Sequence, residues 1–151
     1  MAIEGPCLNA SAACEHILRA LPQWFGIPEA IDFYVAQIEH LPTFLATSGN
    51  ETVGFMTVLK HNAYSAELLV LGVLSDWHRQ GIGRALLAAS ENWLRTDGIE
   101  FLQVKTLGPS CSDEAYERTR LFYERMGFRP LEEFKTLWDE ENPCLLMVKR
   151  L

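Results

Sequence analysis

The chain has 151 residues, 48% of them hydrophobic and 22% charged, a composition typical of one globular domain. Its formal charge of −7 argues against a general nucleic-acid binder, because such proteins present a basic surface. No apolar run reaches the roughly 20 residues that cross a bilayer, and the first residues lack the pattern of a secretory signal. We therefore expect a single domain over residues 1–151, located in the cytoplasm, with neither membrane nor nucleic acid as a partner.

The first half of the chain predicts two helices and a hairpin. One helix covers residues 11–21 and ends at Pro22, and a second covers 28–41 with a proline in its first turn. Strands at 43–47 and 51–59 flank a tight Ser-Gly-Asn turn, so we expect them to pair as a hairpin.

The second half alternates strands with helices. A nearly unbroken apolar run over 67–74 predicts a strand at the centre of a sheet. The clearest helix covers 81–96. Its predicted core stripe is Ile82, Ala85, Leu86, Ala89 and Trp93. The remaining elements are a strand, a helix and two strands, at 101–107, 115–126, 128–137 and 143–151. This order predicts an α/β (α+β) fold, with a mixed, mostly antiparallel sheet of six to seven strands and about four helices.

The cysteines suggest neither a metal site nor a disulfide framework. None forms a C-x-x-C pair, and no histidine spacing is typical of zinc. We expect no metal, and free thiols at Cys7, Cys14, Cys111 and Cys144.

The most informative segment is residues 71–86, where an apolar strand runs into a basic, glycine-bearing turn that opens directly into a helix. The first turn of a helix has N–H groups without internal acceptors, and the helix dipole favours an anion there. Glycines let a ligand approach the backbone closely. The segment therefore predicts a site for a phosphorylated ligand.

Three kinds of phosphate-binding turn compete for this segment. A dinucleotide fold requires G-x-G-x-x-G, but Leu86 stands at the third glycine. The nucleoside-triphosphate motif G-x-x-x-x-G-K-[ST] does not occur in the chain. What remains is a pyrophosphate turn of the form Arg/Gln-x-x-Gly-x-Gly/Ala, which here reads His78-Arg-Gln-Gly-Ile-Gly-Arg84.

With this turn, the chain resembles the GNAT acetyltransferase superfamily over roughly residues 43–151. Leu71-Gly-Val73 stands where the family's central strand meets the pantetheine arm of acetyl-CoA, and 121–128, Leu-Phe-Tyr-Glu-Arg-Met-Gly-Phe, resembles the family's second signature. The resemblance implies a GNAT-like fold with splayed central strands. It also implies acetyl-CoA as the cofactor and direct transfer of the acetyl group to a primary amine.

The resemblance also implies a set of cofactor-binding residues, and the chain departs from the family pattern at two of them. His78 opens the turn where the family has a basic or amide residue, and Tyr116 stands where an asparagine is frequent. Gly72 has a second interpretation, which is to relieve packing against a helix. The implied set is Leu71, Gly72, Val73, His78, Arg79, Gln80, Gly81, Ile82, Gly83, Arg84 and Tyr116.

Glu67 is the candidate general base, because some histone-acetylating members of the superfamily carry a glutamate at the matching place. Strand alternation puts it on one face with Leu69, Leu71 and Val73. A carboxylate in such apolar company is favoured as a proton acceptor. The alternative is a solvated acid at the end of a strand. His61, just before the strand, is a candidate lining residue of the acceptor site.

Tyr123 is the candidate general acid, because it matches the family's second signature and a phenol can protonate a departing thiolate. Helical spacing places it about 100° to one side of the predicted core stripe. The alternative is a packed tyrosine whose hydroxyl bonds the backbone. The predicted stripe consists of Ala115, Thr119, Phe122 and Met126.

These residues favour an N-acetyltransferase over its alternatives, a non-catalytic acyl-CoA-binding sensor or interaction module and a nucleotide-dependent enzyme. We expect the acceptor to be a small-molecule or peptide amine, and the acidic net charge favours a cationic one. The polar turn over 137–144 borders the acceptor, forms a homodimer contact or is a simple hairpin loop.

Overall fold

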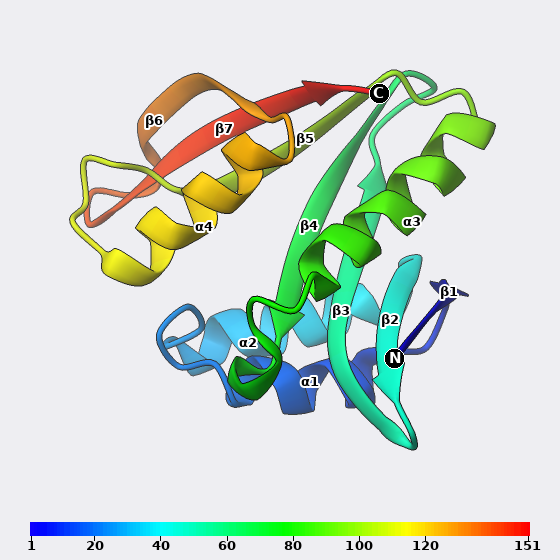
Figure 1. Cartoon of the computed structure of the whole chain (residues 1–151). Coiled ribbons are helices and arrows are strands. Elements are labelled where there is room, and N and C mark those ends of the chain that lie inside the picture. The colour runs from blue at the N-terminus through cyan, green and yellow to red at the C-terminus, as the bar shows by residue number, and fades with distance from the viewer. The chain divides into compact units, whose positions relative to one another are not determined.

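The computed structural model describes all 151 residues, as seven strands, four α-helices and one short 3₁₀-helix (Figure 1). The strands are β1 (Ala2–Cys7), β2 (Thr43–Ser48), β3 (Glu51–Lys60), β4 (Ser65–Val73), β5 (Phe101–Leu107), β6 (Arg129–Asp139) and β7 (Asn142–Arg150). The helices are α1 (Ser11–Arg19), α2 (Pro28–Ile38), α3 (Ile82–Thr96), α4 (Glu114–Arg125) and the 3₁₀-helix η1 (Ser75–Trp77).

One seven-stranded sheet has the order β1-β2-β3-β4-β5-β7-β6, which confirms the predicted α+β class. None of the helices combines the length and the hydropathy that crossing a bilayer requires. The chain divides into two compact units, residues 1–59 with 68–97 (unit 1) and residues 60–67 with 98–151 (unit 2).

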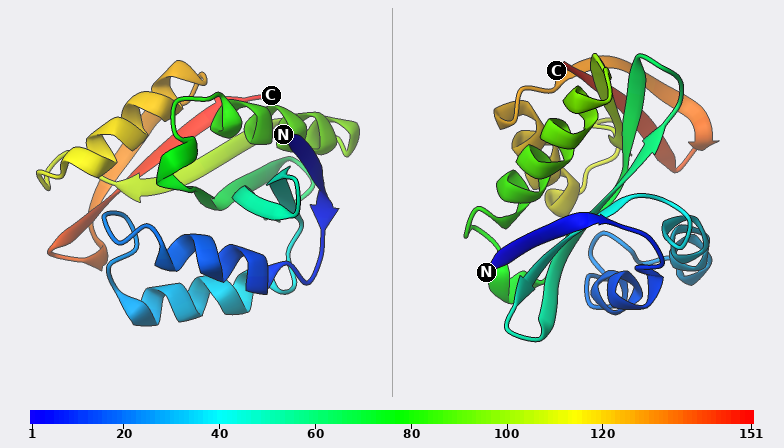
Figure 2. Two further views of the ribbon diagram at one scale, coloured as in Figure 1. Left: turned by 60° about the horizontal axis from the view of Figure 1, so that its bottom comes forward. Right: turned by 90° about the vertical axis from the view of Figure 1, so that its right-hand side faces the viewer.

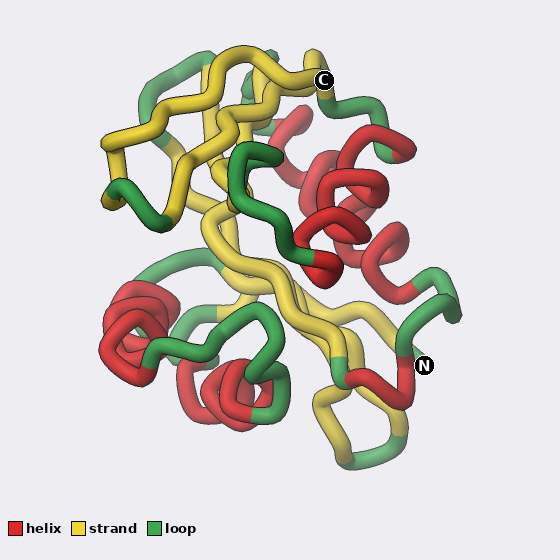
Figure 3. The backbone as a smooth tube through the Cα atoms, turned by 90° about the vertical axis from the view of Figure 1, so that its left-hand side faces the viewer, coloured by secondary structure: helices red, strands yellow, loops and turns green.

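In unit 1, helices cover both faces of the strands. Helices α1 and α2 lie together on one face, and α3 lies on the other (Figures 2 and 3). Phe55 of β3 and Val70 of β4 join the core that α1 and α2 form. The other buried members of that core are Ala10, Cys14, Ile17, Leu18, Leu21, Ile31 and Ile38.

Strand β1 was not predicted from the sequence. It pairs antiparallel with β2, and its register shifts between Glu4 and Cys7. Four of its six residues are exposed. A short strand at the edge of a sheet lacks the alternation of buried and exposed positions that reveals a strand, and Gly5-Pro6 reads as a turn signal.

The buried stripe of α3 differs from the predicted one. Ala85, Ala89 and Trp93 are only half-buried, so their assignment to the core stripe is wrong. The side chain of Ser90 is buried because its hydroxyl donates to the carbonyl of Leu86 at 2.9 Å, which satisfies the polar group inside the core. The buried residues of α3 are Ile82, Leu86, Leu87, Ser90, Glu91 and Leu94.

In unit 2, β7 pairs antiparallel with β5 on one side and with β6 on the other. The β5–β7 register is regular from Phe101 opposite Arg150 to Leu107 opposite Cys144. Asp113 caps the N-terminus of α4, where its carboxylate accepts a hydrogen bond from the Tyr116 amide.

Cys14 makes a testable contribution to stability. Burial, with a smaller effect of Cys7, raises the pKa of its thiol from 9.0 to about 12. The folded chain therefore holds this proton more tightly than the unfolded chain does. The resulting stabilisation is complete below pH 9 and is lost as the pH rises towards 12. Between these values we expect the free energy of unfolding to fall by about 1.4 kcal/mol per pH unit more steeply than in Cys14→Ala. Urea unfolding at a series of pH values measures both slopes, and equal slopes would contradict this expectation.

Candidate functional site

The turn between β4 and α3 in unit 1 has the geometry of an anion cradle. Gly81 precedes the first helical residue in the left-handed conformation, at φ 79°, and no side chain caps the helix. The first-turn amides of α3 therefore have neither an internal acceptor nor a capping side chain. A Cβ built on Gly81 would meet no atom within 4 Å, so the space beside it is open. Arg79 also has a positive φ, 61°, in this turn.

Two side chains of the predicted cradle form hydrogen bonds with backbone carbonyls at the turn. The Nε2 of His78 lies 2.6 Å from the Val73 carbonyl, and the Gln80 amide donates to the Asp76 carbonyl at 3.2 Å. Because a carbonyl only accepts, Nε2 is the donor in this contact. The imidazole also meets the Trp24 ring edge-on, with centroids 5.7 Å apart. Among the cradle residues Ile82 is buried, so it offers a ligand its backbone rather than its side chain.

Gly72 is explained by packing. A Cβ there would lie 3.0 Å from both Ile17 Cγ2 and Phe55 Cε1, and 3.4 Å from Leu21 Cδ1. The missing side chain therefore faces α1 and the core, as the second interpretation of this glycine requires. Its backbone remains a candidate for cofactor binding, together with that of Leu71 and Val73.

We expect Gly72→Ala to lower the free energy of unfolding by about 1–3 kcal/mol, the usual cost of an overpacked core. Denaturant titration measures the loss, and calorimetry on the same variant measures acetyl-CoA affinity. Unchanged stability combined with weaker binding would instead favour the interpretation in which the glycine admits the cofactor.

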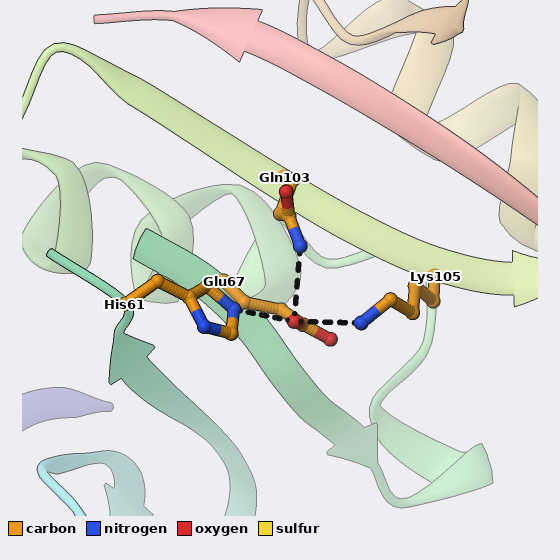
Figure 4. A network of polar contacts seen from close by, with 4 residues as sticks. All are labelled: His61, Glu67, Gln103 and Lys105. Atoms are coloured by element: carbon orange, nitrogen blue, oxygen red, sulfur yellow. Dashed lines mark hydrogen bonds and ion pairs between the residues drawn. The ribbon is translucent and has the colours of Figure 1, made fainter. Parts of the chain in front are cut away.

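In unit 2, a polar cluster surrounds Glu67 near the start of β4 (Figure 4). The side chain of Glu67 is 6% exposed, and its Oε1 atom accepts all three contacts. The partners are His61 Nε2 at 2.8 Å, Gln103 Nε2 at 3.1 Å and Lys105 Nζ at 3.2 Å. Three donors thus contact Oε1, which has only two lone pairs to accept hydrogen bonds. None of the three contacts involves Oε2.

The apolar surroundings predicted for Glu67 are wrong, and so is the alternative of a solvated acid. His61 was singled out as a lining residue, but Gln103 and Lys105 were missed. These two residues alternate on β5, which places both side chains on one face of the strand. Their polarity within a largely apolar strand was a usable signal.

Cys144 of β7 lies near the same cluster and is fully buried. Burial raises the pKa of its thiol; Lys105 opposes this effect and Glu67 adds to it. Because the thiolate is the nucleophilic form of cysteine, Cys144 is poorly suited to carry an acyl group.

Tyr123 is more buried than the sequence predicted. It is 5% exposed, and its ring contacts Phe122 and Phe128 edge-on, with centroids 5.6 and 5.5 Å apart. The predicted stripe is right at Ala115, but Phe122 and Met126 are only half-buried. The cause is the end of α4, where Phe128 donates its amide to the Tyr123 carbonyl at 3.0 Å and is fully buried. Because Phe128 packs against the helix there, the buried face of α4 includes Tyr123.

Tyr116, the remaining predicted cofactor residue, lies in the first turn of α4 and is half-buried. Its backbone amide donates to the capping carboxylate of Asp113, so only its side chain is available to contact a cofactor. No three His, Cys, Asp or Glu side chains gather closely enough to hold a metal ion.

Comparison with known proteins places this geometry in a family. Residues 29–130 match the acetyltransferase (GNAT) domain family. An uncharacterized N-acetyltransferase of Chlorobaculum tepidum is 28% identical over 111 residues, 71% of this chain and 64% of that protein. An aminoglycoside N(6')-acetyltransferase type 1 of Stenotrophomonas maltophilia is 35% identical over 105 residues, 58% of this chain and 67% of that protein. The chain thus spans about two thirds of the length of these relatives.

Solved structures share the whole fold. A crystal structure from Desulfovibrio desulfuricans, assigned to the GNAT acetyltransferases, superposes with a TM-score of 0.86 at 19% identity, covering 99% of this chain and 98% of the other. An aminoglycoside 6'-N-acetyltransferase solved with coenzyme A gives a TM-score of 0.79 at 20% identity, covering 99% and 97%. The family match over two thirds of the residues, supported by this likeness in fold, shows that the chain belongs to the GNAT acetyltransferase family.

Proposed function

We propose that this chain is an N-acetyltransferase that moves the acetyl group of acetyl-CoA to a primary amine by direct attack on the thioester. The observation that carries the proposal is the uncapped N-terminus of α3 behind the glycine turn, in a chain of the GNAT family. Aminoglycoside 6'-N-acetyltransferase, which shares the fold, was solved with coenzyme A.

Unit 1 supplies the groups for the cofactor in this proposal. The first-turn amides of Ile82, Gly83 and Arg84 donate to the diphosphate, and the α3 dipole favours its negative charge. The exposed side chains of Arg79 and Arg84 add positive charge at the turn of an acidic protein. The backbone of 71–73 is the candidate partner of the pantetheine arm and of the thioester carbonyl, where each well-placed donor contributes about 3 kcal/mol.

Unit 2 supplies the groups for proton transfer. An alkylamine is mostly protonated at neutral pH, and freeing its lone pair costs about 4–5 kcal/mol. Glu67 is the proposed acceptor of that proton, through Oε2, because His61, Gln103 and Lys105 all occupy Oε1. The three partners hold the carboxylate in one orientation, which suits a general base.

The nitrogen loses two protons in this reaction. Glu67 takes the first from the ammonium, and the freed nitrogen forms a bond to the acetyl carbon while the carbon–sulfur bond breaks. The nitrogen releases its second proton as the amide forms, which balances the proton that the leaving thiolate takes up. Tyr123 is the proposed donor of a proton to the leaving thiolate. The high pKa of the buried Cys144 thiol supports direct transfer over an acyl-cysteine route.

The proposed acceptor is a cationic small-molecule amine. The chain carries 20 acidic against 13 basic residues, so its overall field attracts cations. The relative from Stenotrophomonas maltophilia is an aminoglycoside acetyltransferase, and an aminoglycoside is a polycation. Aminoglycosides and polyamines are therefore the first compounds to test.

The test is thiol release from acetyl-CoA with a panel of amines, with each product identified by mass. The panel contains aminoglycosides, polyamines, amino acids and peptides with a free N-terminus or lysine. We expect turnover with a polycationic amine. Tight acetyl-CoA binding without turnover on any amine would favour a non-catalytic acyl-CoA-binding module. Affinity for ATP or NAD with none for coenzyme A would overturn both interpretations.

A further inference from the structure

Lys105 carries a primary amine that lies against the proposed general base in unit 2. Its Nζ atom is 3.2 Å from Oε1 of Glu67. In Figure 4 the side chains of Lys105 and His61 approach the carboxylate from opposite sides. The contact is an ion pair with a glutamate whose side chain is only 6% exposed, so the amine of Lys105 is held directly at this buried carboxylate.

The acceptor in the proposed reaction needs the same chemistry. It is a primary amine, mostly protonated at neutral pH, that gives a proton to Glu67 before it attacks the thioester. A lysine side chain ends in such an amine. Its flexible four-carbon stem lets Nζ reach either oxygen of a carboxylate that it already contacts. Lys105 therefore meets, at Glu67, the condition that the proposed function sets for an acceptor.

Lys105 is accessible, but it is not the most exposed lysine of the unit. Its side chain is 32% exposed, whereas Lys60 and Lys135 are exposed residues. Uncatalysed acetylation depends on encounters with dissolved acetyl-CoA, so it favours the two exposed lysines over Lys105. Contact with the proposed base favours Lys105 instead, and the two routes therefore predict opposite orders of reaction.

We propose that Lys105 is a self-acetylation site, at which the chain transfers the acetyl group of its own bound acetyl-CoA to Nζ. The inference rests on the proposed function, because it uses the same cofactor and the same base. The ammonium gives its first proton to Glu67, and the freed Nζ forms a bond to the acetyl carbon while the carbon–sulfur bond breaks. The second proton leaves the nitrogen as the amide forms and balances the proton that the thiolate of coenzyme A takes up.

Acetylation changes the charge of the cluster around Glu67. The ammonium becomes a neutral amide, so Lys105 no longer forms an ion pair with the carboxylate. An amide nitrogen is a poor nucleophile because its lone pair is delocalised into the carbonyl. The reaction at this position therefore stops after one acetyl group per chain.

The test follows the acetylation of each lysine by peptide mass spectrometry after incubation with acetyl-CoA and no added amine. We expect Lys105 to be acetylated about tenfold or more faster than Lys60 or Lys135, a modest share of what a positioned base contributes. The rate per chain is expected to be independent of protein concentration, because the transfer occurs within one chain. A rate at Lys105 no higher than at the exposed lysines would overturn the proposal, and so would a rate that rises with protein concentration.

Glu67→Gln separates catalysed from uncatalysed acetylation. It removes the ion-pair partner of Lys105, which leaves this lysine freer to react without catalysis, but it also removes the proton acceptor. We expect acetylation of Lys105 to be about tenfold or more slower in this variant, with unchanged rates at Lys60 and Lys135. An equal or faster rate at Lys105 would contradict the proposal. Glu100→Gln, at an exposed glutamate of the same unit, is the matched control and is expected to behave as the wild type.

Arg84→Glu provides a second variant, whose outcome does not depend on the folding of Glu67→Gln. Because Arg84 belongs to the proposed cofactor cradle, limiting acetyl-CoA is expected to acetylate Lys105 more slowly in this variant and Lys60 at the wild-type rate. Equal slowing at both lysines, or none at Lys105, would count against self-acetylation. Circular dichroism checks that each variant is folded.

Thiol release with the amine panel, measured on the same preparations, separates the failure of this inference from that of the proposed function. Turnover on an amine without preferential acetylation of Lys105 would overturn the inference alone. Acetylation of neither an amine nor Lys105 would overturn the proposed function as well.

Discussion

Replacing Glu67 by glutamine is expected to lower kcat/KM for the amine by about 10²–10⁴-fold, the usual contribution of a positioned general base. The substitution keeps the size of the side chain, so its main effect is on the proton acceptor. Acetyl-CoA affinity is expected to remain, because Glu67 is not one of the proposed cofactor-binding residues. Steady-state kinetics with saturating acetyl-CoA and calorimetry on the same variant separate the two effects.

Glu100→Gln is the matched control for this experiment, since Glu100 is an exposed glutamate of unit 2. We expect it to keep wild-type turnover. If Glu67→Gln retained turnover within about threefold of the wild type across the pH range, the carboxylate would have no role in proton transfer. A fall in protein stability alone would be visible in the melting temperature and would not explain the loss of rate.

Tyr123→Phe is expected to lower kcat by about 10²-fold while acetyl-CoA binding persists. Phenylalanine keeps the ring contacts with Phe122 and Phe128, so the variant removes little more than the hydroxyl. The loss is expected to shrink with an acyl donor whose thiol is more acidic, because such a thiolate leaves without a proton. A purely packed tyrosine would not respond to the acidity of the leaving group.

Tyr34→Phe, in α2, repeats the same chemical change in unit 1 and serves as the control. Its turnover is expected to match the wild type. Unchanged turnover in Tyr123→Phe, or a loss that is identical for all donors, would reject the role of general acid. The tyrosine would then serve the packing at the end of α4.

Much of the fold follows from the sequence, because its signals are local. The predicted strand at 101–107 is that of the structure, and the helices end near Pro22, Gly98 and Gly127 as proline and glycine require. The strand β1 gave no such signal. Its exposed edge position removes the alternation that hydrophobic patterning depends on.

The candidate site was less predictable because its contacts are not local. The glycine turn and Glu67 were identified from motifs. The partners of Glu67, however, depend on which β5 residues reach it, and strand alternation within β4 alone does not give this. Similarly, Tyr123 is buried because the chain folds back at Gly127 and places Phe128 against it. The helical periodicity of α4 alone does not predict this contact. The stripe of α3 was misjudged because a serine that bonds its own helix is buried as readily as an alanine.

The central claim is that the turn from His78 to Arg84 holds the diphosphate of acetyl-CoA, and calorimetric titration tests it most directly. Arg84→Glu and Arg95→Glu make the same charge change at the two ends of α3. The account predicts one site in the wild type, with a dissociation constant within about 1 μM to 1 mM. It also predicts binding weakened at least tenfold in Arg84→Glu and little changed in Arg95→Glu. No binding by the wild type, or equal binding by the two variants, would contradict it.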